Sequence, residues 1–216
     1  LPLLLKIEPV GDREKQAFTY LQDWKGDTGR DSVATTIYET WFIYLGRAMV
    51  ADDLHGDLYK QMADRSHALF LADIMADPDK NAAWCDNVLT APVETCADTA
   101  RQALDDALDA LTQRLGKDMS QWQWGKVHIT QYPHSPFAQA PVLNWLFDRS
   151  IANGGDRYTV NVAPIDFANL YEQDTVPSYR QIVDLADLGK SVFIHTTGQS
   201  GNLLSAHYSD LIERHR

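Results

Sequence analysis

Apolar residues in the first half of the chain recur every three to four positions, the spacing of amphipathic helices. This pattern predicts helices at residues 13–21, 32–47 and 58–75, with Asp31-Ser32 as the N-cap of the second. The clearest predicted helix covers residues 97–115 and ends before Gly116, a residue type favoured just after a helix. Its apolar stripe consists of Ala97, Ala100, Ala103, Leu104, Ala107, Leu108, Leu111 and Leu115.

In the second half, the spacing of apolar residues changes to the two-residue alternation of strands. Short strands are predicted at residues 122–129, 158–162, 181–185 and 191–196, separated by loops rich in Pro, Gly and Asn. A last helix is predicted at residues 208–216.

Helices followed by strands indicate an α+β protein and not a series of alternating βαβ units. Residues 1–116 are expected to be mainly helical, and residues 117–216 to consist mainly of strands and loops, which would subdivide the chain near its middle. The last predicted strand is expected to be buried, because Val192 and Ile194 alternate with Phe193.

Hydrophobic residues make up 44% of the 216 residues, enough for one sizeable core or two small ones. The net charge of −11 argues against nucleic acid, because phosphate binding requires clustered Lys and Arg. The same charge argues against an anionic membrane surface, and no apolar run approaches the roughly 20 residues that span a bilayer. We therefore expect no nucleic acid and no membrane among the partners.

Cys85 and Cys96 are the two cysteines of the chain, and they lie close together in a proline-containing loop. A metal site would need His or further Cys residues at short spacing, so one disulfide is the better interpretation, with two unrelated buried thiols as the alternative. A disulfide would indicate an oxidising compartment and therefore a periplasmic or secreted protein. Leu1 is not a natural start, so we expect a mature chain or a fragment.

The segment Gly198-Gln199-Ser200-Gly201 places a serine between glycines, but its second glycine comes one position too early for the nucleophile elbow of serine hydrolases. We interpret it as a tight turn in which Gly198 and Gly201 adopt positive φ. Ser200 and Asn202 are expected to bond the backbone of this turn.

The histidines and the paired carboxylates form no ligand or catalytic pattern. His128 and His134 are not at a zinc-ligand spacing, and His128 is expected to be a hydrogen-bonded structural residue. The acidic pairs at residues 52–53 and 105–106 occupy adjacent helical positions that point about 100° apart, so neither pair converges on one substrate atom. Read from its residues alone, the chain builds no complete active site, and we expect no metal or cofactor in it.

Short motifs in a fixed order distinguish the second half of the chain. Their marked residues are Trp124, Gly125 and His128, then Gly155 and Asp156, then Arg180, then Gly198, Gln199, Ser200 and Gly201, and finally His207. Together with the Leu-x-x-Trp-x-Gly segment at residues 21–26, they resemble the penicillin acylase family. These N-terminal-nucleophile amidohydrolases include acylases of N-acyl homoserine lactones. Lys25 and Thr197 depart from the family pattern, and the second departure predicts a slightly different turn.

The resemblance implies a four-layer αββα sandwich, made from a precursor that cleaves itself into a small and a large chain. In the family, the amino-terminal serine of the large chain attacks the amide, and its own amine serves as the base. Residues 1–216 would be a C-terminal portion of the large chain, with the nucleophile and the oxyanion asparagine upstream. No catalytic residue is therefore assigned, the marked motif residues are taken as structural, and a structural calcium would lie elsewhere in the family fold.

Two functions remain as hypotheses. The first is a fragment of an amidohydrolase that cleaves N-acyl compounds such as β-lactams or N-acyl homoserine lactones. Its partners would be the small-molecule substrate and the upstream segments, namely the small chain and the N-terminal part of the large chain. The second hypothesis is an exported, non-catalytic module that binds a partner protein through its aromatic helices.

Overall fold

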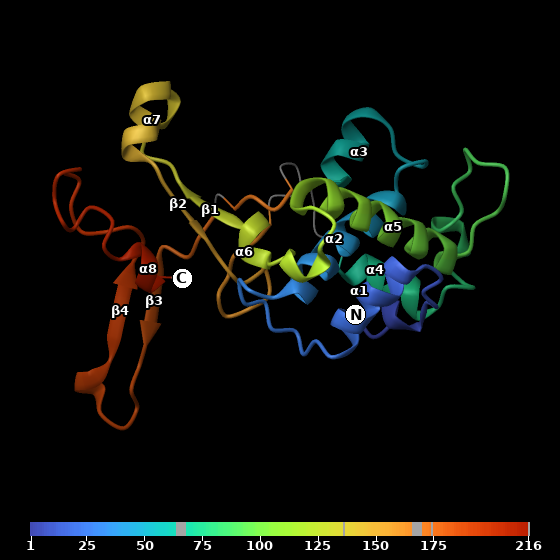
Figure 1. Ribbon diagram of the computed structural model, residues 1–216, viewed down its shortest axis with the longest axis horizontal. Coiled ribbons are helices and arrows are strands. Elements are labelled where there is room, and N and C mark those ends of the chain that lie inside the picture. The colour runs from blue at the N-terminus through green and yellow to red at the C-terminus, as the bar shows by residue number, and fades with distance from the viewer. Residues whose placement is uncertain (64–67, 136, 166–169, 174, 216) are drawn as a thin grey trace. The chain divides into compact units, whose positions relative to one another are not determined.

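The computed structural model describes residues 1–63, 68–135, 137–165, 170–173 and 175–215 (Figure 1). The chain divides into two compact units. Helices combined with a few short strands confirm the α+β class. The first unit comprises residues 1–27 and 32–124, and the second comprises residues 28–31, 125–165 and 170–215.

The first unit is helical in every regular element that the structure describes. Its helices are α1 (Asp12–Gln22), α2 (Val33–Ala48), α3 (Gly56–Ala63), α4 (Ala68–Ala76) and α5 (Cys96–Leu115), with 3₁₀ turns η1 (Leu4–Lys6), η2 (Ala82–Trp84) and η3 (Met119–Gln121). The helices predicted at residues 13–21, 32–47 and 97–115 are confirmed. The prediction at residues 58–75 corresponds to α3 and α4, and its residues 64–67 lie outside the described part. No helix among the described residues is both long enough and apolar enough to cross a bilayer.

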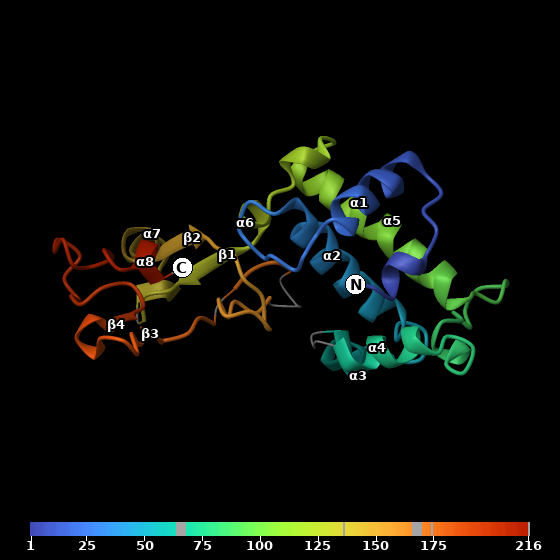
Figure 2. The same ribbon diagram turned by 90° about the horizontal axis from the view of Figure 1, so that it is seen from below.

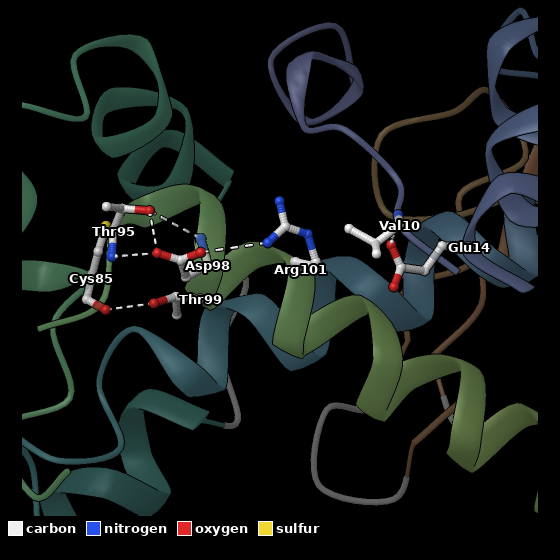
Figure 3. A network of polar contacts seen from close by, with 7 residues as sticks. All are labelled: Val10, Glu14, Cys85, Thr95, Asp98, Thr99 and Arg101. Atoms are coloured by element: carbon white, nitrogen blue, oxygen red, sulfur yellow. Dashed lines mark hydrogen bonds and ion pairs between the residues drawn. The ribbon is translucent and has the colours of Figure 1, made fainter. Parts of the chain in front are cut away.

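Side-chain caps fix where the two longest helices begin, and a glycine ends α5. At the start of α2, Ser32 Oγ accepts the backbone N–H of Thr35 at 3.2 Å, as the serine predicts. At the start of α5, Thr95 and Asp98 each accept the backbone N–H of the other, which forms a capping box (Figure 3). Gly116 ends α5 with a φ of 89°, a conformation that glycine adopts without steric cost.

The core of the first unit lies where α2 and α5 pack along each other (Figure 2). Trp41 of α2 is fully buried, and its indole N–H donates to the carbonyl oxygen of Ala100 at 2.8 Å. Ala97 was predicted in the buried stripe of α5 but is exposed, because Cys96 takes the inward position one turn before Ala100. The buried members of the stripe are Cys96, Ala100, Ala103, Leu104, Ala107, Leu108 and Leu111.

Cys85 and Cys96 form a disulfide with a Cα–Cα distance of 4.8 Å, so the alternative of two unrelated thiols is excluded. Both cysteines are buried, and the bond ties the residue that follows η2 to the first residue of α5. Thr99, one turn into α5, donates its hydroxyl to the Cys85 carbonyl oxygen and strengthens the same junction (Figure 3).

The second unit contains two separate two-stranded antiparallel sheets among its described residues. β1 (Ile129–Tyr132) pairs with β2 (Arg149–Ala152), and β3 (Tyr179–Ile182) pairs with β4 (Val192–His195). The short helices are α6 (Trp124–Val127), which begins at the last residue of the first unit, α7 (Pro141–Phe147) and α8 (Ile212–His215), with 3₁₀ turns η4 (Phe137–Gln139) and η5 (Leu188–Lys190).

The predicted strand at residues 122–129 is wrong, because α6 occupies the middle of this segment. Trp124, Val127 and His128 are all fully buried, and their spacing of three and four residues is that of one helical face. Strand β1 begins only at Ile129.

The predicted strand at residues 158–162 is also wrong. The segment is a loop in which only Val162 joins an isolated bridge, to Asp156. Asp156 Oδ1 accepts the backbone N–H of Thr159 at 2.9 Å, so a side chain replaces the strand partner that this segment lacks. The strand predicted at residues 181–185 begins two residues earlier, as β3.

Two elements of the second unit were not predicted. Strand β2 lacks clear alternation, and α7 is short, although Pro141 at its first turn is a usual helix start. The helix predicted at residues 208–216 forms only over α8, and residue 216 lies outside the described part.

The β3–β4 hairpin is exposed, which contradicts the expected burial of its second strand. Val192 is 57% exposed and Phe193 is 64% exposed, and on the connecting loop Leu185 is 88% exposed. The alternating pattern predicts burial only if a further layer covers the strands, and the described residues supply no such layer for this hairpin.

The disulfide should be present in the purified protein and should stabilise the first unit. Thiol titration of the denatured, unreduced protein should detect no free thiol, and the same titration after reduction should detect two. The bond closes a loop with a sequence separation of 11, so its loss should lower the free energy of unfolding by roughly 2–3 kcal/mol. Two reactive thiols before reduction would contradict the structure.

Candidate functional site

His128 follows α6 and is fully buried, and it is hydrogen-bonded as expected. Its Nδ1 lies 2.9 Å from the carbonyl oxygen of Tyr171, which can only accept, so Nδ1 carries the proton. Burial lowers the pKa of His128 below its usual value, although hydrogen bonds to backbone carbonyls oppose this effect. The imidazole is therefore neutral at pH 7.

Two glycines of the marked motifs let backbone segments of the second unit touch. A Cβ at Gly125 would lie 2.9 Å from the Cβ of Arg30, and the Gly125 N–H donates to the Arg30 carbonyl at 2.6 Å. Gly155 has a φ of 84°, and a Cβ there would lie 2.0 Å from the carbonyl oxygen of Asn161. The Gly155 N–H donates to the Thr28 carbonyl at 2.7 Å, so both glycines hold residues 28–31 in place.

A polar network of five side chains (Thr130, Asn153, Asn161, Gln173 and Arg180) links β1, the loop at residues 153–162, here called the glycine loop, and β3. Thr130 Oγ donates to Gln173 Oε1, and Asn153 Nδ2 donates to Thr130 Oγ at 2.9 Å. Asn161 Nδ2 donates to Asn153 Oδ1 at 3.1 Å, and Arg180 Nη2 donates to Asn161 Oδ1. Thr130, Asn153 and Gln173 are at most 2% exposed, so these bonds satisfy groups that water cannot reach.

The turn at residues 197–201 differs from its prediction. Gly198 and Gly201 do not adopt positive φ, and the positive φ belongs instead to Thr197, at 58°. Gly198 is needed for another reason, because a Cβ there would lie 2.2 Å from the carbonyl oxygen of His207. That carbonyl also accepts the Ser200 N–H at 3.0 Å, whereas a Cβ at Gly201 would meet nothing within 4 Å.

The side chains around this turn serve the local backbone. Ser200 Oγ accepts the N–H of Asn202 at 3.1 Å, which confirms the predicted bond, and His207 Nδ1 lies 2.9 Å from the Asp210 carboxylate. Among the described residues they form no Ser–His–carboxylate chain of the kind that activates a nucleophile. In the same part of the chain, no three His, Cys, Asp or Glu side chains gather as metal ligands would.

The marked motif residues therefore fall into three groups. Trp124 is fully buried and donates its backbone N–H to the Ser32 carbonyl at 3.1 Å, within the first unit. The second group lies on or beside the polar network and consists of Gly125, His128, Gly155, Asp156 and Arg180. The third group forms the turn and consists of Gly198, Gln199, Ser200, Gly201 and His207.

Two cavities adjoin the third group in the second unit. The first has a volume of about 740 Å³, and its walls include the turn together with Tyr132, His134, Phe147, Arg149 and Tyr208. The second has a volume of about 1070 Å³ and is lined mainly by the β3–β4 hairpin, which includes Arg180; Arg214 also lines it.

Comparison with known proteins identifies the class to which this arrangement belongs. The penicillin amidase family matches residues 1–216, and the chain belongs to this family. The acyl-homoserine lactone acylase QuiP of Pseudomonas aeruginosa is 25% identical over 234 residues, covering 99% of this chain and 28% of that protein. QuiP of Pseudomonas putida is 30% identical over 213 residues, covering 94% of this chain and 25% of that protein. The chain thus spans about a quarter of the length of these relatives.

Replacement of Gly198 by alanine should destabilise the second unit, whereas Gly201→Ala should be nearly neutral. The added methyl at position 198 must displace the His207 carbonyl, which should lower the free energy of unfolding by about 1–3 kcal/mol. The same methyl at position 201 meets open space and should change it by less than about 0.5 kcal/mol. Urea denaturation of the two variants measures the difference, and equal losses would contradict the close approach at Gly198.

His128 should make stability fall as the pH is lowered. Its pKa is depressed in the folded state, so the unfolded chain binds more protons below the unfolded pKa of about 6.5. The stabilisation is therefore complete above that pH and declines on acidification, by up to about 1.4 kcal/mol per pH unit. His128→Asn, which keeps a donor for the Tyr171 carbonyl, should flatten the slope between pH 7 and 5. His55→Asn, at an exposed position, is the control and should leave the slope unchanged.

Proposed function

We propose that this chain is a C-terminal portion of the large chain of an acylase that hydrolyses the amide of N-acyl compounds. An acylase-type amidohydrolase is supported by the family, which matches every residue of the chain, and by the names of the relatives. Because those relatives are named acyl-homoserine lactone acylases, N-acyl homoserine lactones are the substrate class we favour, ahead of β-lactams.

In this proposal the nucleophile is an amino-terminal serine that lies upstream of the residues described here. One residue would supply both the attacking hydroxyl and, through its α-amine, the base that activates it. Backbone N–H groups and an asparagine side chain would stabilise the oxyanion that forms at the amide carbon. Ser200 is not assigned this role because its Oγ accepts a backbone N–H within its own turn.

The exposed hairpin supports a four-layer αββα sandwich completed by other parts of the same precursor. Phe193, Val192 and Leu185 are all more than half exposed. A two-stranded ribbon with so much apolar surface becomes stable when further strands and a covering layer remove that surface from water. We assign this role to the small chain and the N-terminal part of the large chain.

The Cys85–Cys96 disulfide supports export to the periplasm or the exterior, because such bonds persist in oxidising compartments. We propose no cofactor for this chain and place any structural calcium elsewhere in the precursor. The alternative, an exported binding module that uses aromatic helices, has less support because Trp41 of α2 is buried in the core and cannot contact a partner.

Residues 1–216 alone should show no amidase activity. Incubation with N-decanoyl homoserine lactone and with a chromogenic phenylacetyl anilide should give only background release, measured by chromatography and absorbance. The full-length polypeptide should hydrolyse at least one of them. Ser178→Ala, at an exposed position, is the control. Hydrolysis by the isolated chain that is lost in Ser200→Ala and kept in Ser178→Ala would show that Ser200 is a nucleophile, and it would refute the proposal.

A further inference from the structure

The cavity of about 740 Å³ has a charge opposite to that of the chain as a whole. The chain carries 30 Asp and Glu against 19 Lys and Arg, yet among the described residues no carboxylate lines this cavity. Its lining includes Arg149, His134 and His195. Asp148, next to Arg149, lies outside the lining and accepts the backbone N–H of His134 at 2.7 Å. The cavity therefore favours an anion.

Two polar side-chain atoms at this cavity lack hydrogen-bond partners. Tyr132 Oη and His134 Nδ1 are enclosed and have no hydrogen-bond partner among the described residues. Tyr132 is only 9% exposed, so its hydroxyl cannot turn to bulk water, and a buried hydroxyl without a partner is costly. Arg149 Nη1 donates to the carbonyls of Leu146 and Asp148 at 3.0 and 2.7 Å, which fixes the guanidinium and leaves Nε and Nη2 for other acceptors.

An aromatic wall lies beside this guanidinium. The Arg149 guanidinium carbon lies 4.9 Å from the centre of the Tyr208 ring, and the Tyr208 hydroxyl donates to the Phe147 carbonyl at 2.7 Å. The ring centres of Phe147 and Phe137 lie 4.7 Å apart, and this packing holds the aromatic wall in place. The cavity volume of about 740 Å³ lies within the range of roughly 300–1,000 Å³ that small-molecule pockets occupy.

We propose that this cavity binds a small carboxylate that carries an apolar or aromatic group. The carboxylate oxygens accept from the Arg149 guanidinium, and Phe147 and Tyr208 cover the apolar group. Hydrolysis of an N-acyl amide releases acids of this class. The reaction as the source of the acid rests on the proposed function. An acidic side chain of the same polypeptide is the rival occupant, and the cavity volume and the aromatic wall favour the small molecule.

The test is a titration of the full-length polypeptide with 4-fluorophenylacetate, followed by ¹⁹F NMR. The neutral alcohol 4-fluorophenylethanol is the matched ligand without charge. We expect the acid to bind at least fivefold more tightly than the alcohol. Arg149→Gln should weaken acid binding at least fivefold, whereas Arg157→Gln, an equal change of charge at an exposed position, should alter it less than twofold. Arg149→Lys keeps the positive charge but loses the planar guanidinium; it should also weaken acid binding, and it replaces Arg149→Gln if that variant fails to fold.

Equal acid binding in the Arg149 and Arg157 variants would overturn the inference. A second pair of results would also overturn it: the wild type fails to bind the acid, and Arg149→Gln lowers the melting temperature. These results together would show that an internal carboxylate fills the cavity. Binding is measured without turnover. A wild type that binds the acid through Arg149 but hydrolyses no N-acyl homoserine lactone would therefore refute the proposed function and leave this site standing.

Discussion

The second unit depends on the requirement that buried amide and hydroxyl groups find partners. In the part of this unit that the structure describes, each sheet has two strands, and two-stranded ribbons bury little apolar surface. Hydrogen bonds of the polar network hold these segments together instead. They join Thr130, Asn153 and Gln173, all at most 2% exposed, and Asn161 connects this group to Arg180. Removal of any one amide would leave its neighbours unpaired out of reach of water, so the members stabilise one another. Gly155 allows the close approach of Asn161, a member of the network, because a Cβ at position 155 would lie 2.0 Å from the Asn161 carbonyl oxygen.

The first unit follows from its sequence because the information is local. The caps at Ser32 and Thr95, the stop at Gly116 and the stripe of α5 act within one or two turns, and the helix predictions there are confirmed. The wrong predictions in the second unit have non-local causes. Trp124 lies in a helical turn because it is buried together with Val127 and His128, which a two-residue pattern does not reveal.

The motif residues of the candidate site could be named from sequence, and the structural roles of His128 and Ser200 were predicted, but the roles of the glycines and of Arg180 were not. The need for glycine at position 198 comes from the His207 carbonyl, and the partners Thr130 and Gln173 are 43 residues apart along the chain. No local signal marks such contacts. Several motifs in a fixed order indicate the family, and the match over residues 1–216 confirms it. The cavity beside Arg149 had no signal in the sequence, since its walls come from separate segments.

The exposed hairpin governs how this chain behaves when it is handled by itself. Each strand of the β3–β4 ribbon keeps one edge unpaired among the described residues, and Phe193 and Val192 present apolar surface beside those edges. Open edges of this kind are templates on which identical copies add strand to strand. Concentration will therefore drive the isolated chain toward aggregation, against which its net charge of −11 is the main defence, and added salt will weaken that defence.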